Sequence, residues 1–261
     1  MANKINYGFQ LPVITPDQWT LGAGQFGGVP LRENGQWDDF LPVYEPQAEK
    51  YETYGCTVWG GQNQIETLFK YIWGIEPNYA ERFNYILVGI RPPGTDPHKA
   101  YESFRNDGLI EHLLLPVPNT YNEFLMPDPM EKGFLVEGQK WLRQYEFKHD
   151  WVLQGKYNEN ILKEALKFCP VAISVSAWFG NEPYEDKGIE NNHWCLLYGW
   201  TDKGWKVFDS YDHSKKIVSF KHNIRFAKRI SLRLRPPEVT LFPWTTRILR
   251  LLILFFKSIW K

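Results

Sequence analysis

Apolar positions recur every three or four residues from Cys56 to Trp73, which predicts a helix with one buried face. The residues of that face are Val58, Ile65, Leu68, Phe69 and Ile72. Gly74 follows at once, and glycine commonly ends helices because it adopts the left-handed conformation without strain. Two further helices are predicted over 98–107 and over 158–168, the second with Asn158 as its N-cap.

The second half of the chain alternates apolar and polar residues instead, which predicts strands. The strands expected are 171–177, 193–200, 204–209, 216–220 and 224–235. Thr201 to Gly204 has the composition of a hairpin turn between the second and third of them. The short apolar run Tyr85 to Ile90 fits either a strand or a buried helical turn, and the prolines between 116 and 129 predict a surface loop.

The order of these elements predicts an α+β protein with two lobes. Residues 1–40 are rich in glycine and proline and are expected to form an extended N-terminal arm. A helical lobe follows over about 41–110 and a β-rich lobe over about 111–235. Residues 236–261 form a proline linker and an amphipathic segment.

The C-terminal segment 247–261 combines basic residues near one helical face with an otherwise apolar surface. Its apolar run is shorter than the roughly eighteen residues that span a bilayer. We therefore expect a helix that lies on a membrane surface or docks on a partner protein, with a packed core helix as the alternative.

Composition narrows the functional classes. The 261 residues carry 30 basic and 30 acidic side chains, so electrostatics favours neither a nucleic acid nor a strongly acidic substrate. Three cysteines without zinc-ligand spacing predict neither a disulfide framework nor a metal site, and no cofactor is expected. The first residues lack the apolar core of a secretory signal, so a cytoplasmic or virion-associated protein is expected.

Cys56, His193 and Asp209 are the candidate catalytic residues. A cysteine attacks as the thiolate, and an imidazole can take its proton near neutral pH. The start of a helix favours a thiolate at Cys56, and Gly55 allows a substrate backbone to approach. The hairpin can place Asp209 beside His193, where it would orient the ring. Taken singly, each residue is also explained as an ordinary buried or turn residue.

Several segments together resemble the papain-like cysteine peptidase family. Pro42-Val43-Tyr44-Glu45-Pro46-Gln47 is similar to the family's Pro-Val-x-x-Gln, and Asn192-His193-Trp194-Cys195-Leu196-Leu197-Tyr198-Gly199 is similar to its Asn-His-Ala-Val-x-x-Val-Gly. Asp209-Ser210-Tyr211 stands where the family has Asn-Ser-Trp, and His193 follows Cys56 at the family's distance of about 130–150 residues. The chain departs from the family in its longer interval from Gln47 to Cys56 and in the sequence around Cys56.

The resemblance implies a two-lobed fold over 41–235, with a helical lobe headed by the Cys56 helix and an antiparallel lobe carrying His193. It implies that Cys56 is the nucleophile, that His193 is the base and that Gln47 forms the oxyanion hole. The cleft would be lined by Gly55, Trp59, Asn192, Trp194 and Tyr211. The partner would be a peptide or protein substrate, and the departures are similar to those of bacteriophage-encoded peptidases.

The expected function is hydrolysis of peptide or isopeptide bonds through an acyl-enzyme. Two alternatives stay open. One is an inactive papain-shaped structural or binding protein, such as a virion component. The other is a Cys-His-Asp cell-wall amidase or acyltransferase. The remaining histidines (His98, His112, His149, His213 and His222) are expected to have ordinary solvent contacts.

Overall fold

A computed structural model of the chain describes residues 7–15, 18, 31–126, 132–186, 188–212 and 214–236. The predicted C-terminal helix over 247–261 and His213 lie outside these residues. None of the helices in the described part of the chain is long and apolar enough to cross a membrane.

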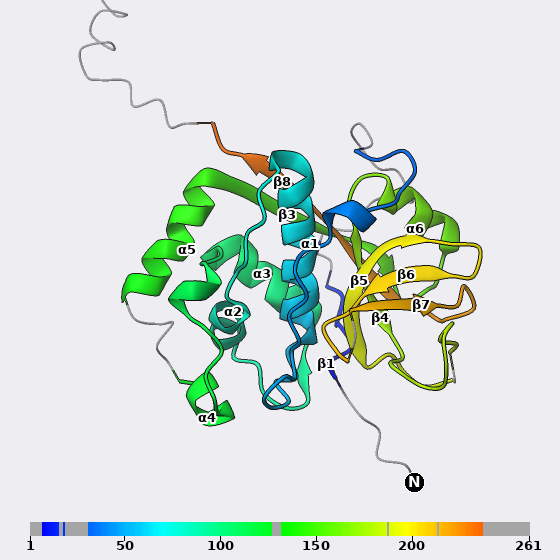
Figure 1. The fold of residues 1–261 in the computed structure, drawn as a ribbon, viewed down its shortest axis with the longest axis horizontal. Coiled ribbons are helices and arrows are strands. Elements are labelled where there is room, and N and C mark those ends of the chain that lie inside the picture. Colours follow the sequence, from blue (N-terminus) through cyan, green and yellow to red (C-terminus); the bar gives the residue numbers. More distant parts are fainter. Residues whose placement is uncertain are drawn as a thin grey trace, which may run out of the picture.

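A long central helix, α1 (Cys56–Trp73), separates a helical side from a sheet (Figure 1). The helical side contains α2 (Glu81–Val88), α3 (Pro97–Asp107), α4 (Tyr121–Phe124) and α5 (Lys132–Gln144). Short elements complete the first half of the chain: β1 (Gly8–Phe9), η2 (Asp38–Phe40), β2 (Gly94–Thr95) and η3 (His112–Leu114). The segment Tyr85 to Ile90 is therefore mostly helical, in α2, rather than a strand.

The sheet has six strands in the order β3-β8-β4-β5-β6-β7, and every neighbouring pair is antiparallel. Its strands are β3 (Tyr145–Gln154), β4 (Val171–Val175), β5 (His193–Trp200), β6 (Trp205–Phe208), β7 (Lys215–Val218) and β8 (Phe226–Leu234). Helix α6 (Glu159–Leu166) packs on β3, β4 and β5. The mixed α+β architecture and the five strands expected after residue 170 are confirmed.

Several predicted boundaries are confirmed in detail. Helix α1 begins at Cys56 and ends at Gly74, which has φ 65° and donates its N–H to the Lys70 carbonyl. The Asn158 side chain caps α6 by accepting a hydrogen bond from the Ile161 N–H. The turn after β5 is closed by a bond from the Thr201 N–H to the Gly204 carbonyl. Helix α5 and strand β3 were not predicted, and α5 packs on α3 rather than on the centre of the sheet.

Helix α1 is buried on all sides, which corrects the prediction of a single buried face. Every residue from Cys56 to Phe69 is buried, whereas Ile72 is exposed. Two glutamines of α1 bind partners inside the protein: Gln62 donates to Asn84 of α2, and Gln64 donates to the Pro170 and Lys228 carbonyls beside the sheet. The helix therefore joins the two sides of the molecule, and its N-terminus lies between them.

Candidate active site

Cys56 is the first residue of α1 and is completely buried. Tyr54 turns the chain into the helix with φ 57°, a conformation unusual for a residue other than glycine. The Glu52 carboxylate accepts the Tyr54 N–H at 2.7 Å and so supports this turn. Burial raises the pKa of the Cys56 thiol well above its ordinary value, although hydrogen bonds from the backbone of Trp194 and Thr57 oppose the shift. In this arrangement Cys56 is a thiol, and it contacts the residue that follows His193.

His193 and Asp209 form a buried pair at the edge of the sheet. His193 begins β5, Asp209 follows β6, and the two strands are antiparallel neighbours, so these ends lie side by side. His193 Nε2 lies 2.5 Å from Asp209 Oδ1, and both side chains are 0% exposed. Among the described residues, His193 Nδ1 is buried without a hydrogen-bond partner. Asp209 thus orients the ring through Nε2, and Nδ1 is available to accept a proton.

Two further side chains bind the second oxygen of Asp209, and sequence reasoning missed both. Trp178 Nε1 donates to Oδ2 at 2.8 Å and Lys216 Nζ donates to it at 2.7 Å. Burial by itself would raise the pKa of Asp209, but the charges of His193 and Lys216 and their hydrogen bonds hold it below its usual value. The sequence could have indicated Lys216. Successive residues of a strand point to opposite faces, so one of the pair Lys215-Lys216 on β7 had to point inward.

Gln47 is buried beside the pair, and its side chain is bound at both ends. Its Oε1 accepts a hydrogen bond from Ser210 Oγ at 2.9 Å, and its Nε2 donates to the Tyr7 carbonyl at 3.1 Å. A backbone bond from the Gln47 N–H to the Ser210 carbonyl, at 2.9 Å, fixes the same contact. The longer interval between Gln47 and Cys56 therefore does not remove this amide from the neighbourhood of Asp209.

Four of the predicted cleft residues have contacts near the ends of α1 and β5. Gly55 and Trp59 lie together, since a Cβ added at Gly55 would meet the Trp59 ring at 2.4 Å. The Tyr211 ring lies 6.3 Å from that of His193, and its hydroxyl donates to Glu52 at 2.7 Å. The Asn192 carbonyl accepts the Tyr7 N–H at 3.1 Å.

Trp194 contacts Cys56 through its backbone, whereas its side chain lies on the opposite face of β5 from His193. It is completely buried, and its ring stacks on Phe9 and lies edge-on to Trp151 in the core. The physical reason is the period of two along β5, which sends the side chain after His193 to the opposite face of the strand.

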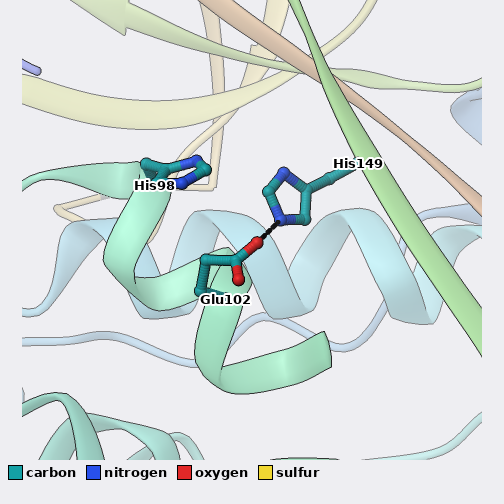
Figure 2. A group of neighbouring side chains, drawn as sticks. All are labelled: His98, Glu102 and His149. Atoms are coloured by element: carbon teal, nitrogen blue, oxygen red, sulfur yellow. Dashed lines mark hydrogen bonds and ion pairs between the residues drawn. The ribbon is translucent and has the colours of Figure 1, made fainter. Parts of the chain in front are cut away.

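A second cluster joins α3 to β3 (Figure 2). His98, Glu102 and His149 offer ligand atoms within 4.8 Å of one another, and His149 Nε2 lies 2.8 Å from Glu102 Oε1. Lys228 Nζ, however, lies 3.1 Å from Nδ1 of His149 and 3.3 Å from Nδ1 of His98. This buried amine already binds both rings, and when protonated it repels a second cation. The geometry therefore indicates a lysine-centred network rather than a metal centre.

Ligand atoms of Glu45, Glu81 and His112 also lie within 4.8 Å of one another, but the protonation expected for this group does not favour a metal. Burial raises the pKa of Glu81 well above its usual value, so this carboxyl group favours its neutral form. The histidines also differ from expectation. His149 is buried against Glu102, and His222 accepts the Ser176 N–H at 2.9 Å, so neither has ordinary solvent contacts. His149 lies on β3, and His222 lies in the turn between β7 and β8.

Comparison with solved structures identifies the architecture. The chain is similar to the digestive procathepsin L 3 of Tenebrio molitor larval midgut, with TM-score 0.61 and 14% identity over 87% of this chain and 77% of that one. The fold is papain-like. Xylellain, a cysteine protease from Xylella fastidiosa, matches with TM-score 0.58 and 13% identity over 86% of this chain and 96% of that one. The clostridial cysteine protease Cwp84 matches with TM-score 0.60 and 12% identity over 76% of this chain and 57% of that one.

At these identities the likeness extends to the fold. Neither a protein-family model nor the sequence of a curated protein matches this chain. The two-lobed papain-like architecture expected from the short motifs is thus confirmed by structure alone. The solved structures are those of cysteine proteases, and this directs attention to the thiol, imidazole and carboxylate described above.

Proposed function

We propose that this protein is a thiol-dependent peptidase whose nucleophile is Cys56. The observation that carries the proposal has two parts. A cysteine is the first residue of α1 and contacts the Trp194 backbone, and an imidazole is oriented by Asp209, which directly follows the adjoining strand. A papain-like fold supports it, because the solved structures of this shape are cysteine proteases.

In the proposed reaction His193 first accepts a proton and later returns it. His193 Nδ1 takes the proton of Cys56, and the sulfur attacks the carbonyl carbon of a peptide bond. The Gln47 Nε2 group and the Cys56 N–H stabilise the negative charge on the carbonyl oxygen. His193 returns the proton to the leaving amine, and water then hydrolyses the thioester to a carboxylate and free Cys56. Asp209 keeps Nε2 of His193 protonated throughout.

The test measures labelling and hydrolysis in parallel. An epoxide or iodoacetamide-type reagent should modify Cys56, and casein should be cleaved. Cys56→Ala should abolish both, whereas Cys169→Ala, at a buried cysteine outside the proposed site, should change neither. Both assays should include Gly8→Ala, because the added methyl would meet the Tyr54 carbonyl oxygen at 2.1 Å and displace Tyr7 from Gln47. The proposal would be refuted if neither wild type nor Gly8→Ala formed a Cys56 adduct or cleaved casein.

Peptidoglycan should be assayed beside casein, because a Cys-His-Asp site also serves cell-wall amidases. Cleavage of peptidoglycan without cleavage of casein would assign the site to the amidase class.

A second candidate function is a binding or structural protein, such as a virion component. The observation that favours it is the complete burial of Cys56 and His193, with the Tyr7 ring against His193. Burial leaves the Cys56 thiol with a raised pKa. A reactive Cys56 in the Gly8→Ala chain would argue against this second function.

A further inference from the structure

Glu52 lies in the loop between Gln47 and Cys56, and its carboxylate accepts hydrogen bonds from three parts of the proposed site. Its Oε1 accepts the Tyr54 N–H at 2.7 Å and also lies 3.4 Å from Gln47 Nε2. Its Oε2 accepts the Tyr211 hydroxyl at 2.7 Å. One carboxylate thus joins the loop before the proposed nucleophile, the proposed oxyanion donor and the loop after β6.

The neighbours of Glu52 fix its loop against Gln47. Thr53 Oγ1 donates to the Gln47 carbonyl at 2.9 Å and accepts the Gly55 N–H at 3.2 Å. The Thr53 carbonyl accepts the hydroxyl of Tyr85, on α2, at 2.6 Å. The interval from Gln47 to the cysteine, which is longer than in the papain-like family, therefore brings a carboxylate back to the Gln47 side chain.

The partners of Gln47 determine which way its amide group faces. A hydroxyl can donate or accept, so the Ser210 hydroxyl bound to Oε1 does not choose between the two orientations. The Tyr7 carbonyl and the Glu52 carboxylate only accept, so both require the nitrogen on their side. The proposed reaction uses one N–H of this group for the carbonyl oxygen of the substrate, and Glu52 is then the acceptor that still holds the other.

We infer that Glu52 is a positioning residue that turns the Nε2 group of Gln47 toward the carbonyl oxygen of the substrate. This rests on the proposed function, because Glu52 acts through the proposed oxyanion donor. If the amide turned over, Oε1 would face the developing negative charge and repel it instead of stabilising it. The contribution of Glu52 is therefore made in the transition state and not in substrate binding.

The experiment measures kcat and KM of the full chain on a fluorogenic peptide that contains a casein site cleaved by wild type. Glu52→Met removes both acceptor oxygens, and kcat should fall about tenfold to hundredfold at little change in KM, because losing an oxyanion donor outright typically costs about 10²–10³ in kcat. Glu52→Gln keeps one acceptor oxygen and should recover most of this loss. Glu49→Met, which removes an exposed carboxylate of the same loop, should leave kcat unchanged.

A double variant tests whether Glu52 acts through Gln47. Gln47→Ala alone and Gln47→Ala combined with Glu52→Met should have the same kcat, since without the amide there is nothing left to orient. A double variant whose loss is the product of the two single losses would overturn the inference. Equal kcat values for Glu52→Met and wild type would overturn it as well.

The orientation of the amide is also measured without any substrate. The side-chain NH₂ signals of Gln47, assigned in NMR spectra by their loss in Gln47→Ala, should exchange with solvent faster in Glu52→Met than in wild type and Glu52→Gln. Circular dichroism should show all of these chains folded. Unchanged exchange in Glu52→Met would overturn the inference whatever the activity. Faster exchange in a protein that cleaves no peptide would leave the hold of Glu52 on Gln47 standing and remove the proposed function.

Discussion

Lys216 Nζ lies 2.7 Å from Asp209 Oδ2, and both side chains are 0% exposed. A buried carboxylate therefore binds two side chains, His193 on one oxygen and Lys216 on the other. Lys216 also donates to the Tyr211 carbonyl at 2.6 Å, so it ties the loop after β6 to β7. A carboxylate paired with a lysine holds an imidazole by a hydrogen bond while adding less net negative charge than a free carboxylate.

Removal of Lys216 should destabilise the fold. In Lys216→Met the buried Asp209 carboxylate keeps only its hydrogen bonds with His193 and Trp178, and removing one partner of a buried ion pair typically costs about 3–5 kcal/mol. Urea unfolding measures this loss. Lys215→Met, on the exposed face of the same strand, should change the free energy of unfolding by less than about 0.5 kcal/mol. Equal stability of Lys216→Met and wild type would contradict this role.

Substitution of Asp209 should destabilise the fold through Lys216. Asp209→Asn leaves a buried ammonium group without its carboxylate, which typically costs about 3–5 kcal/mol. Asp209→Asn combined with Lys216→Met removes both charges and should recover part of that loss. Urea unfolding of the two single variants and the double variant gives the coupling energy. Additive effects would mean that the two side chains do not interact.

Stability should rise with pH because of Lys228. Burial lowers the pKa of Lys228 to about 7, although Asp96, Glu102 and Asp150 oppose the shift. In the unfolded chain a lysine titrates near 10.4, so between these values the unfolded state holds one more proton than the folded state. The free energy of unfolding should therefore increase by up to about 1.4 kcal/mol per pH unit between pH 7 and about pH 10.

The lysine contribution is isolated by comparing wild type with Lys228→Met in urea at pH 7, 8 and 9. The variant should lack this increase, so that the difference between the two chains changes with pH. Lys148→Met is the control, because Lys148 lies on the same sheet with its side chain 64% exposed. Parallel pH profiles for wild type and Lys228→Met would rule out a neutral Lys228 in the folded state.

Gly61→Ala should loosen the contact between α1 and α3. A Cβ at Gly61 would lie 2.5 Å from the Phe104 ring, and overpacking of this kind typically costs about 1–3 kcal/mol. Alanine in a helix otherwise gains about 1 kcal/mol over glycine, so Gly133→Ala in α5 should be neutral or stabilising. Phe104→Leu, which shortens the obstructing ring, should partly rescue Gly61→Ala. Thermal unfolding of the four chains measures all of these effects.

Local patterns determined much of the fold. The three- and four-residue spacing, Gly74 and Asn158 predicted the limits of α1 and α6, and alternation predicted β4 to β8, because these signals depend on residues close in sequence. The order of Cys56, His193 and Asp209 was also readable from the chain, and the structure pairs His193 with Asp209. The roles proposed for Cys56 and Gln47 stay predictions.

Only the tertiary structure decided what surrounds these groups. The polar side chains of α1 resembled a solvent face, but their partners on α2 and beside the sheet are distant in sequence, so the helix is buried all round. Lys216 reaches Asp209 from β7 and Trp178 from the turn after β4, and Tyr7 contacts Gln47, which is 40 residues away in sequence. The sequence determined which residues could act, whereas long-range packing determined their partners, since contact between distant segments follows from the whole fold and not from any local spacing.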